Sequence, residues 1–148
     1  MATVIVPADA VVTLGVTLTL GGKTFDITAS KTLSSATLAD RRIVNVPTSE
    51  VDLITLTAAV VGKGQFSAFD GFFIVNRDDT NFVRLRIRQA AGDTADVRLD
   101  AGDFMCFWNS KLEVNTTAAA FGAFVDWDTV AVQANTAAVD LEYLAIAI

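Results

Sequence analysis

The amino-acid sequence predicts an all-β protein, an antiparallel β-sandwich of the jelly-roll-like or Greek-key kind. In several segments apolar and polar residues alternate with a period of two, which is typical of half-buried antiparallel strands. Turn signals separate these segments at roughly 8–12-residue intervals, as they do in sandwiches and barrels. No segment shows the period of a long helix, and the 148 residues include only two prolines.

The clearest alternation lies between Phe72 and Asp103. One face of a predicted strand carries Val83, Leu85 and Ile87, and the other face carries Arg84, Arg86 and Arg88. After a turn signal at Gly92, the next strand repeats the pattern and turns Val97 and Leu99 inward. The two segments therefore predict a hairpin with one buried face.

The arginine row has two interpretations, and the sequence leaves both open. A loop centred on Gly92 would place Arg88 opposite Asp96 and Arg84 opposite Asp100, and such cross-strand pairs contribute roughly 0.2–1 kcal/mol each. Alternatively, the row forms a salt-bridge surface for another subunit or protein, because the planar guanidinium suits a carboxylate partner. The acidic residues beside the row make nucleic acid a poor partner.

The remaining elements follow from the same alternation and from turn residues. The other expected strands are residues 12–20 and 24–29, joined by a Gly21-Gly22-Lys23 turn, then 41–46, 51–61, 72–75, 104–108, 112–115, 130–133 and 139–148. Residues 30–40 are weakly patterned, so we expect a loop with at most one helical turn. We expect a single β-sandwich domain over residues 1–148, with residues 1–70 as a candidate source of an assembly arm or hairpin.

Composition limits the classes of function. The net charge of −6 and the pI of about 4.4 argue against binding to nucleic acid or to an anionic membrane, both of which need a basic surface. The hydrophobic fraction of 52% is high, although no apolar run approaches the roughly 20 residues of a membrane-spanning helix. The excess is best explained by surface that is buried against other copies or a partner.

The single cysteine, Cys106, allows no disulfide within the chain, which favours synthesis in a reducing compartment. It lies in the apolar run from Phe104 to Trp108, so we expect a packed core thiol.

The side chains needed for catalysis are scarce. The chain has no histidine, which removes the commonest general base and most zinc sites. A two-carboxylate glycosidase would have to draw on Glu50, Glu113 and Glu142, and nothing in the sequence brings two acids together. Asp126-Trp127-Asp128 has the spacing of a metal-binding DxD motif, but a solvated turn with a packed tryptophan is the favoured interpretation. We predict no enzyme activity, no cofactor and no metal.

Three aromatic residues, Trp108, Trp127 and Tyr143, have two interpretations. They could form a stacking platform for a sugar, as in carbohydrate-binding sandwiches. Aromatic residues more often fill a core or an oligomer interface, which is the interpretation we favour.

Three strings of residues resemble small virion structural proteins of tailed bacteriophages. In those proteins a strand with the pattern N-x-D-x-T-N-[FY]-V precedes a hairpin, an L-x-A-G-[DE] turn and a final V-[DE]-[VL]-E-Y strand. This chain has matching residues at Asn76–Val83, Leu99–Asp103 and Val139–Tyr143, within a similarity that covers about residues 70–148. The first seventy residues carry no such resemblance.

The resemblance implies a non-enzymatic β-sandwich protein that is made in the bacterial host cytoplasm and incorporated in many copies into the virion. We expect a capsid decoration or cement protein that bridges capsomers. Its partners would be itself, as a homotrimer, and the major capsid protein or other virion proteins, with no nucleic acid and no membrane. The alternatives are a tail, neck or fibre component, and a carbohydrate-binding module for host surface recognition. The expected assembly contacts are Arg84, Arg86, Arg88, Phe104, Phe107 and Trp108.

Overall fold

The computed structural model describes residues 6–57, 65–89, 94–112 and 124–148. It confirms the predicted fold class, because the described residues form antiparallel strands and no helix. The chain divides into two compact units, one of residues 1–37 with Ile148 and the other of residues 38–147. Within the described ranges, no helix is long and apolar enough to cross a membrane.

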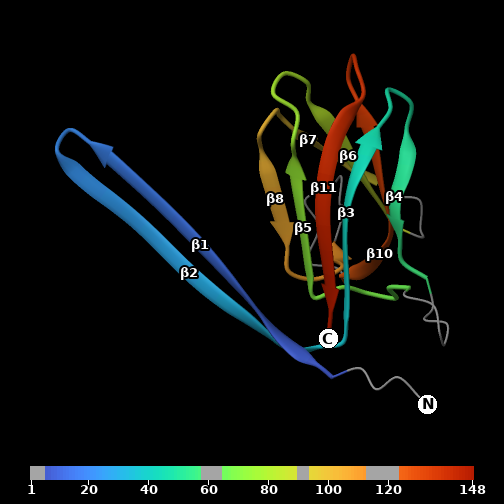
Figure 1. Cartoon of the computed structure of the whole chain (residues 1–148), viewed down its shortest axis with the longest axis horizontal. Helices are drawn as coiled ribbons and strands as arrows, with labels where there is room; N and C mark the ends of the chain where they lie inside the picture. Colours follow the sequence, from blue (N-terminus) through green and yellow to red (C-terminus); the bar gives the residue numbers. More distant parts are fainter. Residues whose placement is uncertain (1–5, 58–64, 90–93, 113–123) are drawn as a thin grey trace. The chain divides into compact units, whose positions relative to one another are not determined.

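The first unit is a β-hairpin (Figure 1). Strands β1 (Ala8–Leu20) and β2 (Lys23–Ala36) pair antiparallel, with Leu20 opposite Lys23. Gly21 and Gly22 both have positive φ, 57° and 77°, as a two-residue type I′ turn requires. The predicted hairpin is thus confirmed.

The loop predicted for residues 30–40 is wrong. Strand β2 continues to Ala36 and β3 begins at Leu38. Residues 8–13 of β1 lie opposite this segment, so ladder pairing extends the strand where the side-chain pattern is weak. Serine and threonine on an exposed strand face are compatible with this conformation.

The second unit is a sandwich of two sheets (Figure 1). Its strands are β3 (Leu38–Val46), β4 (Val51–Thr55), β5 (Gly71–Asn76), β6 (Val83–Gln89), β7 (Thr94–Leu99), β8 (Phe104–Phe107), β9 (Lys111–Leu112), β10 (Val125–Ala134) and β11 (Val139–Ala147). One sheet has the order β4-β10-β6-β7, with β9 also paired to β10, and the other has the order β3-β11-β5-β8. Apart from β9, each sheet has four strands. In each sheet the strand that comes first along the chain pairs with the strand that comes last, β4 with β10 and β3 with β11, which is a jelly-roll-like arrangement.

The core lies between the sheets. Val83, Leu85 and Ile87 of β6 point into it and are almost completely buried, as the alternation predicts. An aromatic cluster fills its centre, where the Trp127 ring meets the edges of Phe69 and Phe107 at centroid distances of 5.1 and 4.6 Å. The buried faces of the strands are therefore the faces that the sequence assigns to the core.

The register of the β6–β7 hairpin differs from the prediction. Arg86 lies opposite Asp96, Arg84 opposite Arg98, and Arg88 opposite Thr94. The predicted pairs are therefore wrong by two residues. A shift of two residues keeps every side chain on its own face, so alternation alone cannot choose between these registers. Gly92 lies outside the described residues.

Three strand boundaries also differ. Strand β4 ends at Thr55, earlier than predicted, and residues 58–64 lie outside the described part. Strand β10 begins at Val125, so Asp126-Trp127-Asp128 lies in a strand and not in the expected turn. Of the predicted strand 112–115, β9 includes only Leu112, and residues 113–115 are not described.

Candidate assembly surfaces

The arginine row lies on the outer face of the β4-β10-β6-β7 sheet. The register places Asp52, Ala131, Arg86 and Asp96 in one row across the four strands. Arg86 donates through Nε and Nη2 to the two carboxylate oxygens of Asp96, at 2.8 Å each. This hydrogen-bonded pair holds the pKa of Asp96 below its ordinary value.

Glu50, just before β4, is the shared acceptor of the row. It accepts hydrogen bonds from Arg84 at 2.8 Å and Arg86 at 3.0 Å, and a third from Arg88. Ala131 of the intervening strand is fully buried beneath these side chains, and its small size leaves room for the guanidiniums to cross β10. We call the residues Arg84, Arg86, Arg88, Glu50, Asp52 and Asp96 the arginine network.

The arginine network balances its own charge, because three arginines meet three carboxylates. The predicted ladder is confirmed in part, since Asp96 belongs to it. Asp100 does not belong to it, because its carboxylate pairs at 2.6 Å with Arg98, two residues earlier in the chain. That the arginines contact another subunit stays a prediction.

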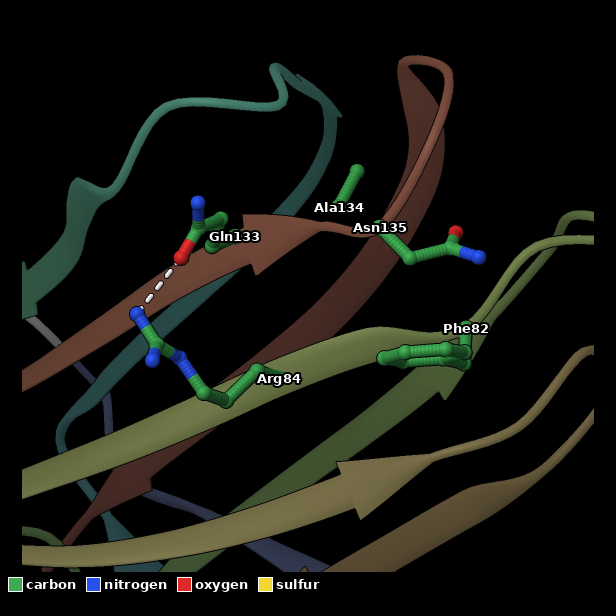
Figure 2. Close-up of a pocket in the computed structure, with 5 residues that line it drawn as sticks. All are labelled: Phe82, Arg84, Gln133, Ala134 and Asn135. Atoms are coloured by element: carbon green, nitrogen blue, oxygen red, sulfur yellow. Dashed lines mark hydrogen bonds between the residues drawn. The ribbon is translucent and has the colours of Figure 1, made fainter.

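A shallow pocket lies at one end of the arginine network (Figure 2). Its volume is about 290 Å³, and it is lined by Phe82, Arg84, Gln133, Ala134 and Asn135. Figure 2 shows Arg84 turned toward Gln133, whose Oε1 accepts a hydrogen bond of 2.5 Å. The Arg98 guanidinium stacks over the Phe82 ring at 4.1 Å. The pocket is at the small end of the range for ligand sites, and these polar groups already bond to one another.

The outer face of the β3-β11-β5-β8 sheet is largely apolar. The register places Ile43, Glu142, Val75 and Phe104 in one row, and Arg41, Leu144, Phe73 and Cys106 in the next. Ile43 and Phe104 are 64% and 67% exposed. We call the residues Ile43, Phe73, Val75, Phe104, Cys106 and Leu144 the sandwich apolar face.

Glu142 lies in the middle of the sandwich apolar face. Its Oε1 accepts from Arg41 Nε at 2.7 Å, and its Oε2 accepts from Arg77 Nε at 2.9 Å. The hydrogen bonds from Arg77 and Arg41 hold the pKa of this carboxyl below its ordinary value. A general acid needs the opposite shift, so this environment suits an ion pair better than proton transfer.

The six predicted assembly residues do not form one site. The three arginines lie on one sheet, whereas Phe104 lies on the outer face of the other. Phe107 points inward, with its ring against Trp127 and Phe72. Trp108 is half-buried and packs edge-on against Phe73 at 5.7 Å.

The prediction that Cys106 is a core thiol is wrong, because Cys106 is exposed. Strand β8 alternates, so Phe104 and Cys106 point outward while Met105 and Phe107 point inward. An apolar run in a short strand hides this alternation from the sequence.

A third surface, which was not among the predicted assembly contacts, lies on the hairpin. The β1–β2 register pairs Val16 with Ile27 and Leu18 with Phe25, so apolar residues of both strands share one face. Six of these residues are 43–67% exposed, and we call them the hairpin apolar face: Leu14, Val16, Leu18, Leu20, Phe25 and Ile27. The opposite face is rich in threonine. The signal was the matching alternation of both strands around Gly21-Gly22, which predicts one shared apolar face.

The motif at Asn76–Asn81 proves to be a cross-brace. The fully buried Asn76 donates through Nδ2 to the carbonyls of Asn81, Leu99 and Asp100, at 2.8, 3.2 and 3.0 Å. Asp78 Oδ1 accepts from the backbone amides of Thr80 and Asn81 at 2.8 and 2.6 Å. These residues tie the β5–β6 connection to the end of β7.

The residues considered for metal and sugar chemistry are engaged elsewhere. Asp126 accepts a hydrogen bond of 2.6 Å from Ser110 Oγ, which lowers its pKa, and pairs with Lys111 at 3.3 Å. Among the described residues, no group of three or more acidic, cysteine or histidine side chains could hold a metal ion. Trp127 and Tyr143 are only 3% exposed, which confirms their interpretation as core residues. Glu113 is not described.

Comparison with protein-family models, with curated proteins and with solved structures found no match.

Proposed function

We propose that this chain is a non-enzymatic structural protein of a bacteriophage virion, a capsid decoration or cement protein that stabilises the head by bridging capsomers. The observation that carries the assembly part of this proposal is the hairpin apolar face, with six large apolar side chains 43–67% exposed. The virion part rests on the resemblance at Asn76–Val83, Leu99–Asp103 and Val139–Tyr143.

The hairpin supports an assembly role on energetic grounds. A two-stranded hairpin is only marginally stable in water by itself, so an apolar face of this length needs a partner surface. Full burial of one large apolar side chain contributes about 1.5–3 kcal/mol, and these side chains have roughly half of that still to gain. The six residues together offer on the order of 5–9 kcal/mol before the costs of association are subtracted.

The sandwich apolar face supports the same proposal. Ile43 and Phe104 are large and exposed, and they lie at the two ends of one row that also contains Glu142 and Val75. Glu142 lies within this row, and its ion pairs with Arg41 and Arg77 stabilise its charged form. A cement protein acts through such complementary area and requires no reacting group.

The charge distribution agrees with a role in assembly rather than in catalysis. The carboxylates Glu50, Asp96 and Glu142 each pair with arginines of the same unit. Proton-transfer catalysis favours a carboxyl whose pKa is raised, whereas the pKa values of Asp96 and Glu142 are lowered.

Copy number in purified particles tests the proposal. Particles would be prepared from the phage that carries this gene, and the chain would be quantified by mass spectrometry relative to the major capsid protein. We expect a copy number comparable to the number of capsomers. A few copies per particle would identify a tail, neck or fibre component, and absence from particles would contradict the proposal.

A glycan array tests the carbohydrate-binding alternative. A cement protein is expected to show no saccharide-specific binding, and the burial of Trp127 and Tyr143 supports this expectation. Reproducible binding to one sugar class would favour host recognition instead.

A further inference from the structure

The hairpin is electrically neutral, whereas the chain is acidic. Within Ala8–Ala36 two aspartates, Asp9 and Asp26, balance two lysines, Lys23 and Lys31, so the net charge is zero. The whole chain carries −6, so all of its excess negative charge lies outside the hairpin. Copies of this chain can therefore approach one another through their hairpins without the like-charge repulsion expected elsewhere.

The hairpin apolar face is also self-complementary. Leu14 lies opposite Ala29, Val16 opposite Ile27 and Leu18 opposite Phe25, which leaves a face with no charged side chain between its ends. Lys23 and Lys31 are at the two ends, where long side chains can extend into water. The face needs only another apolar face as its partner, and symmetric oligomers use patches of this kind.

The hairpin apolar face is smaller than a complete interface. It runs over the seven positions from Leu14 to Leu20, which at about 3.3 Å per residue gives roughly 20 Å. A width of two strands, on the order of 10 Å, makes this a strip of roughly 200 Å² in projection, and two such strips cover less than the roughly 1,200 Å² of a standard specific interface. The contact between hairpins would therefore be one part of the interface between copies.

We propose that the hairpin apolar face packs against the same face on the hairpins of other copies of this chain. This deepens the proposed function, because it identifies the partner of one of the surfaces on which that function rests. A second copy is favoured as the partner because the hairpin is neutral, so two hairpins meet without the like-charge repulsion that the acidic remainder of the chain would cause.

Substitutions on the two faces of the hairpin test the proposal. Leu18→Asp introduces a charge into the hairpin apolar face, and Thr19→Asp introduces the same charge on the threonine face, opposite Thr24. We expect wild type and Thr19→Asp to share a mass that is a multiple of 15.7 kDa by light scattering, and Leu18→Asp to have the mass of one chain. Unchanged thermal unfolding of the sandwich would show that Leu18→Asp has not unfolded the protein. A monomeric wild type, or equal effects of both variants, would overturn the proposal.

Cross-linking identifies which surface the hairpin contacts. Leu18→Cys and Thr19→Cys would each be made in full-length protein with Cys106→Ser, since Cys106 is exposed and would react. A bis-maleimide that spans the roughly 10 Å between packed sheets should link Leu18→Cys copies at least tenfold faster than Thr19→Cys copies. An oligomer that shows no preferential link at Leu18→Cys would overturn hairpin-to-hairpin packing. It would leave the proposed function standing, because that is decided by copy number in particles.

Discussion

Arg86 of β6 and Asp96 of β7 face each other across the ladder and share two hydrogen bonds of 2.8 Å. Bidentate geometry of this kind is the arrangement in which an exposed arginine–carboxylate pair contributes measurably. The pair is 29% and 41% exposed at its side chains, which keeps its contribution small through solvent screening.

A double-mutant cycle of Arg86→Gln and Asp96→Asn measures this pair. We expect a coupling free energy of about 0.5–1 kcal/mol, the upper part of the range for exposed pairs, from chemical denaturation of the four proteins. Arg84→Gln combined with Asp100→Asn is the matched control, because Asp100 pairs with Arg98 and should show no coupling. Equal coupling in both cycles would contradict the register.

Glu50→Gln should destabilise the protein more than Asp52→Asn. Glu50 accepts from three arginines, so its loss leaves three positive charges close together, whereas Asp52 accepts from Arg88 alone among these three. We expect a loss of about 1–2 kcal/mol for Glu50→Gln and less than about 0.5 kcal/mol for Asp52→Asn, measured as free energies of unfolding. The reverse order would show that Glu50 is not the centre of the arginine network.

Asn76→Ala should lower the free energy of unfolding by about 2–4 kcal/mol. The substitution removes a fully buried amide and leaves three buried or half-buried carbonyls without that donor. Asn45→Ala is the control, since Asn45 is exposed and its Nδ2 donates to the Asp140 side chain at 2.9 Å. Comparable losses for both variants would argue against the cross-brace.

Tyr143 should titrate late. Burial, followed by its hydrogen bond of 2.9 Å to Asp40, raises its pKa from 10.0 to about 12. Because it is the only tyrosine, the ultraviolet absorbance of tyrosinate reports this residue alone. The folded protein holds the proton more tightly than the unfolded chain, so this residue contributes stability below pH 10 that is lost as the pH rises toward 12. A folded-state midpoint at 10 would contradict the burial of Tyr143.

Acid should destabilise the sandwich through Glu142. Its pKa is below the ordinary 4.5, so the stability it contributes is present above pH 4.5 and is lost as the pH falls through the folded value. We expect Glu142→Gln to flatten the dependence of unfolding free energy on pH in this acid range, with thermal unfolding as the readout. An unchanged slope would indicate that Arg41 and Arg77 do not hold this carboxylate in solution.

Strand alternation predicted which side chains are buried, but it did not predict which residues of neighbouring strands lie opposite one another. Val83, Leu85 and Ile87 are buried because a period of two assigns faces directly. Register is different, because a shift of two residues leaves the faces unchanged, and Asp96 therefore lies opposite Arg86 rather than opposite the predicted Arg88.

The candidate site could be predicted only in part for the same reason. Phe104 and Phe107 are neighbours in sequence but lie on opposite faces of β8, so a run of apolar residues does not make one surface. Glu50 is 34 residues from Arg84, and only the sheet order brings the two together. The hairpin apolar face was visible as two alternating segments, but its exposure follows from tertiary structure.

The mass of the purified wild-type chain in solution, measured by light scattering after size exclusion, tests most directly the claim that copies of this chain associate with one another. We expect an oligomer, with a homotrimer at three times 15.7 kDa as the expected form. A single species of 15.7 kDa at every concentration would contradict it.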